Sequence, residues 1–552
     1  MLFRAAINSK WLYYCICGII VLMKNFSTFT KDELKKLNKT SLILIIGSLQ
    51  NQIEHISGQL DTLTEQIALM NQRSFGRKTD RFDQFPGQMS LFGGTDSSTL
   101  PAAEPEITEI TVSAHTRKTK SRREDLLEGL PARIHNHTLS DEELAEQFPE
   151  GYKELPVEIY KRLSVIPETY MVDEHHVHVY ASKKNDGRIV RAARPKDMFR
   201  NSIATPSLVS DVITSKFLNH VPTDRQSKRF MENGIPLETN TLSNWLIRSS
   251  EVYLGTIYDE LIRAILGSKV IHADETPFNV IRDGRDPGAN SYMWVYRSGV
   301  CDIHPVVIYD YQESRRMDHP EEFLKDYNGI LVTDGYQVYH SLVKKRTGLL
   351  VAGCWVHAKR KFSELIKFLG KNAADGIIAA EASKRISRLF HLDKQWKDLS
   401  KEEREKQRQL VLKPLVDDFF AWAKESILKV PAESATGRGL QYCINQEQFL
   451  RVFLSNGDVP MDNNLAEQAI RPFTIGRKNW VTTNSIEGAR SNAILYSLVE
   501  TARANDLHVY NYINYILEEL VKHLDDTDRS FIKDLLPWSD KVRQKCPVLK
   551  KS

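Results

Sequence analysis

Three acidic residues stand in three distinctive local contexts and are the best candidates in this sequence for chemistry. Asp274 lies in Val-Ile-His-Ala-Asp-Glu-Thr-Pro, Asp334 in Ile-Leu-Val-Thr-Asp-Gly-Tyr, and Glu467 in Asp-Asn-Asn-Leu-Ala-Glu-Gln-Ala-Ile-Arg-Pro. The first two each end a short β-rich run, and the third lies in a helix-like stretch. Carboxylates on rigid elements suit Mg²⁺, and two such ions support phosphoryl transfer. The pattern therefore predicts a catalytic site with two Mg²⁺ ions that acts on a nucleic-acid backbone.

Basic side chains near these acids are candidates for contacts with a DNA backbone, and Trp480 could stack on a base. Surface charge neutralised by salt bridges is the alternative. Glu275 and Asp462 lie beside or near the three acids, and we expect them to support ligands or face solvent rather than bind metal. The predicted DNA contacts of this group are Lys359, Arg360, Lys361, Arg471, Arg477, Lys478 and Trp480.

The elements between residues 269 and 368 must position the first two acids. Alternating or continuous apolar runs predict strands at 269–278, 292–297, 305–311, 329–333 and 349–355, with helices at 320–327 and 357–368. Three strands, a helix, a strand, a strand and a helix is the ribonuclease H-like order, in which the first acid lies on the first strand and the second follows the fourth. Charged, helix-like residues at 371–455 predict a helical insertion before Glu467.

Three helices are expected between residues 206 and 248, at 206–219, 224–233 and 239–248. The turn Glu232-Asn233-Gly234-Ile235-Pro236 between the last two is typical of a helix-turn-helix unit. Asn240 and Asn244 would lie near the start of its second helix, with side chains suited to bases or phosphates. A purely structural three-helix unit is the alternative.

Residues 42–70 carry apolar residues at a regular four-three spacing over four heptads, which predicts a coiled coil. We expect the chain to form a homo-oligomer through it. A helix packed against its own domain is the alternative. Residues 84–116 are rich in Pro, Gly, Ser and Thr and predict a linker, followed by a basic tract at 117–123.

Composition gives only broad limits. A length of 552 residues is too long for one core. The net charge of +4 does not itself indicate a nucleic-acid binder, so the local basic clusters matter more. The six cysteines are scattered without a Cys-x-x-Cys pair, which disfavours disulfides and cysteine-based zinc sites and fits a reducing cytosol.

The N-terminus carries an uncharged run at residues 11–23 that is short for a membrane helix. We expect no stable membrane association. Translation from Met23, a membrane-associated segment and a buried helix are the open explanations of this run.

These observations predict a multidomain α+β protein. Its expected parts are an N-terminal segment (1–38), a coiled coil (39–83), a linker with a basic tract (84–123), a small β-containing domain (124–196), a helix-turn-helix-like region (197–262), a ribonuclease H-like catalytic domain (263–487) with a helical insertion (371–455), and a C-terminal helical region (488–552).

The same motifs, in this order, carry a family resemblance that spans nearly the whole chain after residue 40. The chain resembles the transposases of the insertion-sequence-66 family, which belong to the DDE group. The matching segments include Phe-Gly-Arg-Lys-Thr-Asp at 75–80, Ile-His-Ala-Asp-Glu-Thr-Pro at 271–277, Asp-Gly-Tyr at 334–336, Gly-Cys-Trp-Val-His-Ala-Lys-Arg-Lys-Phe at 353–362, Asp-Asn-Asn-Leu-Ala-Glu at 462–467 and Gly-Arg-Lys-Asn-Trp at 476–480.

The resemblance implies a DNA transposase that binds the ends of an insertion sequence and catalyses metal-dependent strand cleavage and strand transfer. Asp274, Asp334 and Glu467 would be the metal ligands, with two Mg²⁺ ions that Mn²⁺ could replace. Cys354 and His357 resemble a Cys-x-x-His signature of several transposase groups and would have a structural or orienting role. Two such residues alone make a zinc site improbable. The family's zinc-finger-like cysteines are missing, because residues 124–195 contain no Cys.

The implied partners are the terminal repeats of the element and target DNA, with accessory proteins of the same element as further candidates. The implied location is the bacterial cytoplasm, at the nucleoid when the protein is bound to DNA. Two other functions remain open: a catalytically decayed protein that binds the element ends or regulates transposition, and a repair nuclease with the same site.

Overall fold

The structure is a computed structural model of the chain. It describes residues 46–47, 50, 142, 169–181, 189–286, 288–369 and 376–548. The predicted N-terminal segment, the linker and nearly all of the predicted coiled coil lie outside these residues and stay predictions. Within the described ranges, no helix combines the length and apolar character needed to cross a membrane.

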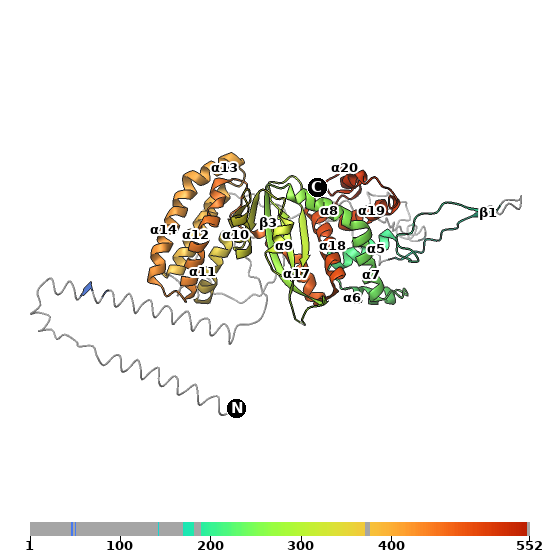
Figure 1. Cartoon of the computed structure of the whole chain (residues 1–552), viewed down its shortest axis with the longest axis horizontal. Helices are drawn as coiled ribbons and strands as arrows, with labels where there is room; N and C mark the ends of the chain where they lie inside the picture. The colour runs from blue at the N-terminus through green and yellow to red at the C-terminus, as the bar shows by residue number, and fades with distance from the viewer. Residues whose placement is uncertain are drawn as a thin grey trace, which may run out of the picture. The chain divides into compact units, whose positions relative to one another are not determined.

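The described residues fall into two compact units, and each is considered by itself. One is helical and corresponds to most of the predicted insertion. The other contains the sheet, the helices that cover it and all three candidate acids. Figure 1 shows the elements with their labels.

The sheet has the order β5-β4-β3-β6-β7, and β8 pairs with the far half of β3. Strands β3, β4 and β5 are antiparallel, whereas β3, β6 and β7 are parallel. The predicted strands therefore exist, although β3 is longer than expected and β8 was not predicted. The strands are β3 (Val270–Arg282), β4 (Ser291–Ser298), β5 (Val307–Gln312), β6 (Ile330–Thr333), β7 (Leu350–Gly353) and β8 (Thr482–Ser485).

Helices cover both faces of this sheet. On one face lie α9 (Asp318–Phe323) and α10 (Gln337–Lys345), where Phe323 stacks on Tyr296 of β4 with ring centroids 3.9 Å apart. On the other face lies α17 (Asn464–Trp480), where Phe473 meets Phe278 of β3 edge to face at 5.3 Å. Because both faces are covered, Val270 to Ala273 are all buried, as expected for the centre of a layered sheet.

The edge of the sheet at β5 is closed by side-chain hydroxyls of α18 (Ile486–Ala504). Thr501 Oγ1 accepts from the Val307 amide and donates to the Val307 carbonyl, both at 3.0 Å. Ser497 Oγ accepts from the Tyr309 amide at 2.8 Å. These contacts satisfy backbone groups that an exposed edge strand would leave unpaired.

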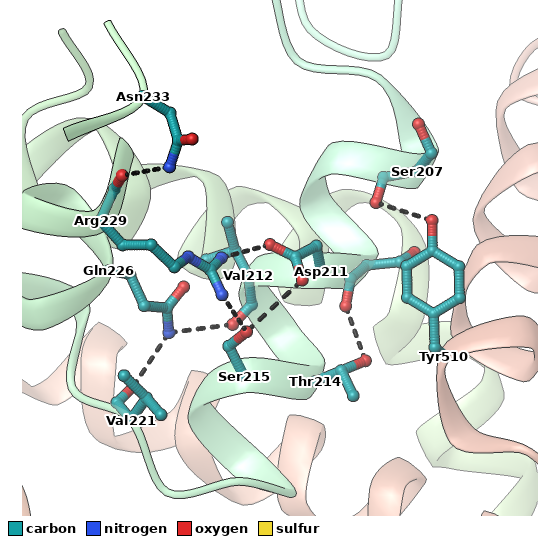
Figure 2. A network of polar contacts seen from close by, with 11 residues as sticks. Ser207, Asp211, Val212, Thr214, Ser215, Val221, Gln226, Arg229, Asn233 and Tyr510 are labelled. Atoms are coloured by element: carbon teal, nitrogen blue, oxygen red, sulfur yellow. Dashed lines mark hydrogen bonds and ion pairs between the residues drawn. The ribbon is translucent and has the colours of Figure 1, made fainter. Parts of the chain in front are cut away.

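The predicted three-helix unit is present as α5 (Pro206–Phe217), α6 (Thr223–Glu232) and α7 (Thr239–Ser249). Figure 2 shows the polar network that fixes α6 against α5. Arg229 Nη2 lies 2.5 Å from Asp211 Oδ2, and the buried Gln226 donates from Nε2 to the Val212 carbonyl at 3.3 Å. Because α6 and α7 are joined by a short turn, this network also limits the orientation of α7.

Smaller elements lie outside the main sheet. A small antiparallel pair, β1 (Val179–Ala181) and β2 (Ile189–Arg191), lies in the predicted β-containing domain. The sheet-containing unit also includes a π-helical turn at Ser250–Leu254, α8 (Gly255–Leu266), α19 (Val509–Lys522), a 3₁₀ turn at Ser530–Leu535 and α20 (Asp540–Lys545).

The helical unit is built mainly from α11 (Trp355–Leu369), α12 (Ile378–Gln395), α14 (Lys413–Ser426) and α15 (Ala435–Asn445). Between them lie a π-helical turn at Arg408–Leu412 and a 3₁₀ turn at Ile427–Lys429. The short helices α13 (Lys401–Gln407) and α16 (Glu447–Leu450) each span a point where the chain passes from one unit to the other, and the 3₁₀ turn at Val452–Ser455 belongs to the sheet-containing unit.

Candidate active site

Two of the three predicted acids lie level with each other on neighbouring strands. The parallel register pairs His272 of β3 with Val332 of β6. Two residues further along, Asp274 on β3 and Asp334 directly after β6 therefore come side by side, where neighbouring strands are about 4.8 Å apart. The parallel pairing of β3 with β6 therefore brings the two acids close together, although they are far apart in the sequence.

The third acid lies on the helix that covers the same face of β3. Along α17, Phe473 packs on Phe278, and Arg477 donates to Thr276 Oγ1 at 2.9 Å. Side chains alternate along a strand, so Asp274 points to the same face as Thr276 and Phe278. Glu467 lies in the first turn of α17 and is half-buried. The structure therefore places Glu467 on the helix that faces Asp274.

The electrostatic setting of Asp274 reflects this convergence. Burial and the negative charges of Glu275, Asp334 and Glu467 raise the pKa of Asp274 to about 8. A hydrogen bond from the Glu275 amide to Asp274 Oδ1, at 2.9 Å, acts in the opposite direction. No basic side chain in the described ranges forms an ion pair with Asp274. A bound cation would therefore offset an unfavourable charge arrangement.

The adjacent acid, Glu275, points to the other face and is fully engaged there. Arg315 forms an ion pair with Glu275 Oε1, and Tyr339 of α10 donates to Oε2 at 3.1 Å. The Glu275 side chain is only 2% exposed. Burial raises its pKa, while Arg315 and the Tyr339 hydroxyl lower it in part. These contacts engage both carboxylate oxygens of Glu275 within the protein. That Glu275 supports the site and does not bind metal stays a prediction.

Asp334 is held at the start of a turn that leads into α10. Its Oδ1 accepts a hydrogen bond from the Tyr336 amide at 3.0 Å, and Gly335 between them has a φ of 97°. A side chain is rarely tolerated at that angle, so the glycine allows the turn. The Arg315 guanidinium lies over the Tyr336 ring at 3.8 Å and connects this turn to Glu275.

Asn463 and His272 are site residues that the sequence did not single out. Asn463 is fully buried and contacts both His272 and the Ala273 carbonyl on β3. Burial lowers the pKa of His272 to about 4, so the imidazole is neutral near pH 7. In the sequence, the sign that could have pointed to Asn463 was its place in the motif Asp-Asn-Asn-Leu-Ala-Glu, which ends at Glu467. Asp462, by contrast, accepts from the Asn464 amide at 3.0 Å and caps the helix.

The donor set suits a hard cation, because Asp274, Asp334 and Glu467 offer only oxygen ligands. In the described part of the chain, no group of three or more His, Cys, Asp or Glu side chains lies close enough to hold a metal ion as placed. The charges of Asp334 and Glu467 nevertheless act on Asp274, and Coulomb interactions reach beyond a coordination bond. The residues present therefore fit Mg²⁺ by chemistry and by electrostatics.

The predicted DNA contacts near Glu467 have different surroundings. Arg471 and Lys478 are exposed, whereas Arg477 donates to Thr276 and to the Pro277 carbonyl and so fastens α17 to β3. Trp480 is half-buried: Lys216 lies 5.6 Å from its ring, and the Tyr496 ring 6.2 Å away. Arg477 and Trp480 therefore have packing contacts within the protein.

The remaining predicted site residues lie on two other helices and at the end of β7. On α11, Lys361 is exposed and Lys359 and Arg360 are half-buried, with Arg360 Nη1 donating to His357 Nε2 at 3.3 Å. Cys354 is buried directly after β7, and its Sγ accepts from the Asn463 amide at 3.3 Å. On α7, Asn240 and Asn244 are both exposed and lie one turn apart.

Comparison with protein families decides the affiliation. Residues 201–491 match the family described as "Transposase IS66 family", which is more than half of the 552 residues. The chain belongs to the IS66 family of transposases. Two further matches agree with this assignment: residues 497–538 match the "IS66 C-terminal element", and residues 62–134 match "Transposase C of IS166 homeodomain". The family resemblance predicted from the motifs is thus confirmed.

Related proteins are found in Sinorhizobium fredii (strain NBRC 101917 / NGR234). The uncharacterized protein y4hP is 31% identical over 362 residues, which cover 62% of this IS66-family chain and 64% of y4hP. The match therefore spans less than two thirds of that relative. The uncharacterized proteins y4jD and y4qI are each 27% identical, with 69% of this chain covered and 75% and 71% of theirs.

Proposed function

We propose that this chain is a DDE-type DNA transposase that binds the ends of its insertion sequence and cuts and joins DNA, with Asp274, Asp334 and Glu467 as the catalytic carboxylates. The observation that carries the proposal is the shared position of these acids. Asp274 and Asp334 lie level on neighbouring strands, and Glu467 lies on the helix that covers Asp274. The charges of Asp334 and Glu467 add to the effect of burial in raising the Asp274 pKa.

The strand order supports a ribonuclease H-like catalytic domain. That fold places the first acid on the first strand of the sheet and the second after the fourth, and here Asp274 lies on β3 and Asp334 follows β6. Three antiparallel strands followed by two parallel ones is the arrangement expected for such a domain, with β3 in the centre. The helical unit fits the predicted insertion between Asp334 and Glu467.

The acids would hold two Mg²⁺ ions, or Mn²⁺ in their place, and the bound ions would activate the attacking oxygen and stabilise the leaving oxygen. The chain's own residues prepare this site. Asp274 must lose its proton to act as a ligand, so cation binding and proton release are coupled. Glu275 is kept on the opposite face by Arg315 and Tyr339, which leaves Asp274 as the acid of β3 directed towards Glu467.

DNA contacts are proposed for polar residues of α7 and α17 in the sheet-containing unit and of α11 in the helical unit. Asn240 and Asn244 share one exposed face of α7 and would contact bases or phosphates of the terminal repeats. Arg471 and Lys478 would contact the backbone beside Glu467. The contacts inside the protein suggest that Arg477 and Trp480 mainly hold α17 in place, and Lys359, Arg360 and Lys361 stay candidates for DNA binding on α11.

The proposal has four further parts: self-association through the N-terminal coiled coil, accessory proteins of the same element, target DNA as a second substrate, and a location at the bacterial nucleoid. They rest on the heptads at 42–70 and on the family assignment. The proposed assembly is a homo-oligomer that brings two element ends together.

A strand-transfer assay tests the proposal. The purified chain is mixed with Mg²⁺ or Mn²⁺, labelled DNA from the ends of its element and a target plasmid. We expect joined products with wild type and with Glu251→Gln, an exposed carboxylate on the π-helical turn. Asp274→Asn and Glu467→Gln should bind the ends without cutting them. End binding by wild type without any cutting would instead indicate a decayed, end-binding protein, and cutting without joining would indicate a nuclease.

A further inference from the structure

Asn463 joins three parts of the candidate site. Its Nδ2 donates to the Ala273 carbonyl at 2.8 Å, and its Oδ1 lies 2.9 Å from His272 Nδ1. Its backbone amide donates to Cys354 Sγ at 3.3 Å, directly after β7. The side chain is fully buried. Asn463 thus connects the two residues of β3 that precede Asp274 with the end of β7.

The hydrogen-bond roles at Asn463 are fixed by elimination. The Ala273 carbonyl can only accept, so the atom facing it must be the amide nitrogen. Oδ1 therefore faces His272 Nδ1, and that nitrogen must carry the proton. A side chain without both a donor and an acceptor in this geometry cannot make both bonds.

Asn463 does not have the local role that asparagine usually has at the start of a helix. Asn463 is the N-cap residue of α17, and asparagine is among the best residues for capping a helix with its own side chain. Here it makes no side-chain cap, and Asp462 caps the Asn464 amide instead. A local preference given up for a long-range contact is typical of functional positions.

Asn463 also lies one helical turn before the third acid. The Glu467 amide donates to the Asn463 carbonyl at 3.2 Å, so these two residues form the first turn of α17. An α-helix rises by about 1.5 Å per residue, which leaves Glu467 about 6 Å along the axis from Asn463. Any displacement of Asn463 from β3 would therefore move Glu467 relative to Asp274.

We propose that Asn463 is a positioning residue that fixes Glu467 against Asp274 by tying the first turn of α17 to His272, Ala273 and Cys354. The inference rests on the proposed function, because it assigns a role within that site. Asn463 touches neither DNA nor metal in this role. It acts through the placement of the carboxylate one turn away.

The test compares Asn463→Ala with Asn464→Ala in the full-length chain. Asn464 is the matched control, because it is the adjacent asparagine and is only half-buried. Mn²⁺ binding without DNA is measured by electron paramagnetic resonance, and cleavage of labelled element ends gives kcat and KM. Thermal melting and end binding show whether each variant is folded.

We expect Asn463→Ala to weaken Mn²⁺ binding and to lower kcat by about 10- to 100-fold, the usual effect of removing a group that orients a ligand. KM for the DNA ends should stay at the wild-type value, and an unchanged melting temperature with normal end binding separates this result from a loss of folding. Asn464→Ala should match wild type in all measurements. Wild-type Mn²⁺ affinity and kcat in a folded Asn463→Ala variant would overturn the inference.

If Asn463→Ala does not fold, Asn463→Ser decides the question. Serine also caps helix N-termini well, so it preserves the start of α17 but cannot bridge His272 and Ala273. The same loss of Mn²⁺ binding and kcat supports the inference, and wild-type values contradict it. Failure of the proposed function looks different: wild type itself would then show no cleavage that depends on Asp274.

Discussion

Asp274 and Glu275 are adjacent acids of the same strand, and their surroundings are opposite. Glu275 lies against Arg315 and Tyr339, so its charge is compensated inside the fold. Asp274 faces α17, and burial together with the charges of neighbouring acids raises its pKa to about 8. Proteins rarely bury an acid without a partner unless that acid has a function. We therefore propose that the Asp274 side of β3 is the chemical face, where catalysis takes place, and that the Glu275 side is the supporting face.

The largest effect is expected at Asp334, the other acid on the chemical side. Asp334→Asn should lower DNA cleavage by about 10³-fold or more, as loss of a central catalytic group usually does. End binding and the melting temperature should stay near wild type, because the amide can still accept from Tyr336. Asp326→Asn, an exposed acid upstream of β6, is the control and should cleave normally. Normal cleavage by Asp334→Asn would remove this residue from the site.

On the supporting face, removal of Arg315 should mainly affect stability. Arg315→Ala leaves the buried Glu275 charge uncompensated, and we expect a loss of about 2–3 kcal/mol in urea unfolding. This is less than for a fully buried pair, because Arg315 is 41% exposed. Arg316→Ala is the matched control, since Arg316 is exposed and paired with Asp318, and it should cost below about 0.5 kcal/mol. Equal losses for both variants would refute the supporting role of the Arg315 pair.

The raised pKa of Asp274 predicts a pH-dependent stability in buffer without divalent cations. The folded chain holds this proton up to about pH 8, whereas an unfolded aspartate loses it near its ordinary pKa of about 4. The contribution of Asp274 to stability therefore falls as the pH rises from about 4 to 8. Asp274→Asn should remove this dependence and stabilise the fold by roughly 1–3 kcal/mol at pH 8, with little effect at pH 4. Urea unfolding of wild type and of Asp274→Asn at pH 4 and at pH 8 checks this prediction. A difference in unfolding free energy between the two proteins that is the same at both pH values would contradict it.

The smallest effect is expected where polar groups only close the sheet. Thr501→Val keeps the shape of the side chain but leaves the amide and carbonyl of Val307 without their hydroxyl partner. We expect a loss of about 1–2 kcal/mol in unfolding free energy and a normal rate of DNA cleavage. Thr214→Val in α5, whose hydroxyl bonds only within its own helix, should cost clearly less. A change in cleavage rate with Thr501→Val would show that the α18 contact also affects the site.

The sequence predicted those parts of the site that depend on local patterns. Apolar runs located β3, β6 and β7, and the acid at the end of each of the first two runs indicated where Asp274 and Asp334 lie. The turn before α7 was equally visible from Gly234 and Pro236. Period-two and period-three-to-four patterns are local properties, so they can be recognised in a single sequence.

The parts that could not be predicted depend on contacts between distant residues. Arg315 lies far along the chain from Glu275, and Asn463 lies further still from His272, so nothing in the local sequence pairs them. The helix α10 (Gln337–Lys345) was missed because its sequence follows a turn and has few strong helix signals. Strand β8 was missed because Thr-Thr-Asn-Ser has almost no apolar character and forms only where β3 offers a free edge.

The most direct test of the central claim compares Asp274→Asn with Glu275→Gln in one cleavage assay on labelled element ends. Glutamine keeps an oxygen that can accept from Arg315, and its amide nitrogen can donate to the Tyr339 hydroxyl. We therefore expect Glu275→Gln to keep cleavage within about tenfold of wild type. Asp274→Asn should fall by about 10³-fold or more while the folded protein still binds the ends. Cleavage that survives in Asp274→Asn and disappears in Glu275→Gln would contradict the assignment of the chemical face of β3.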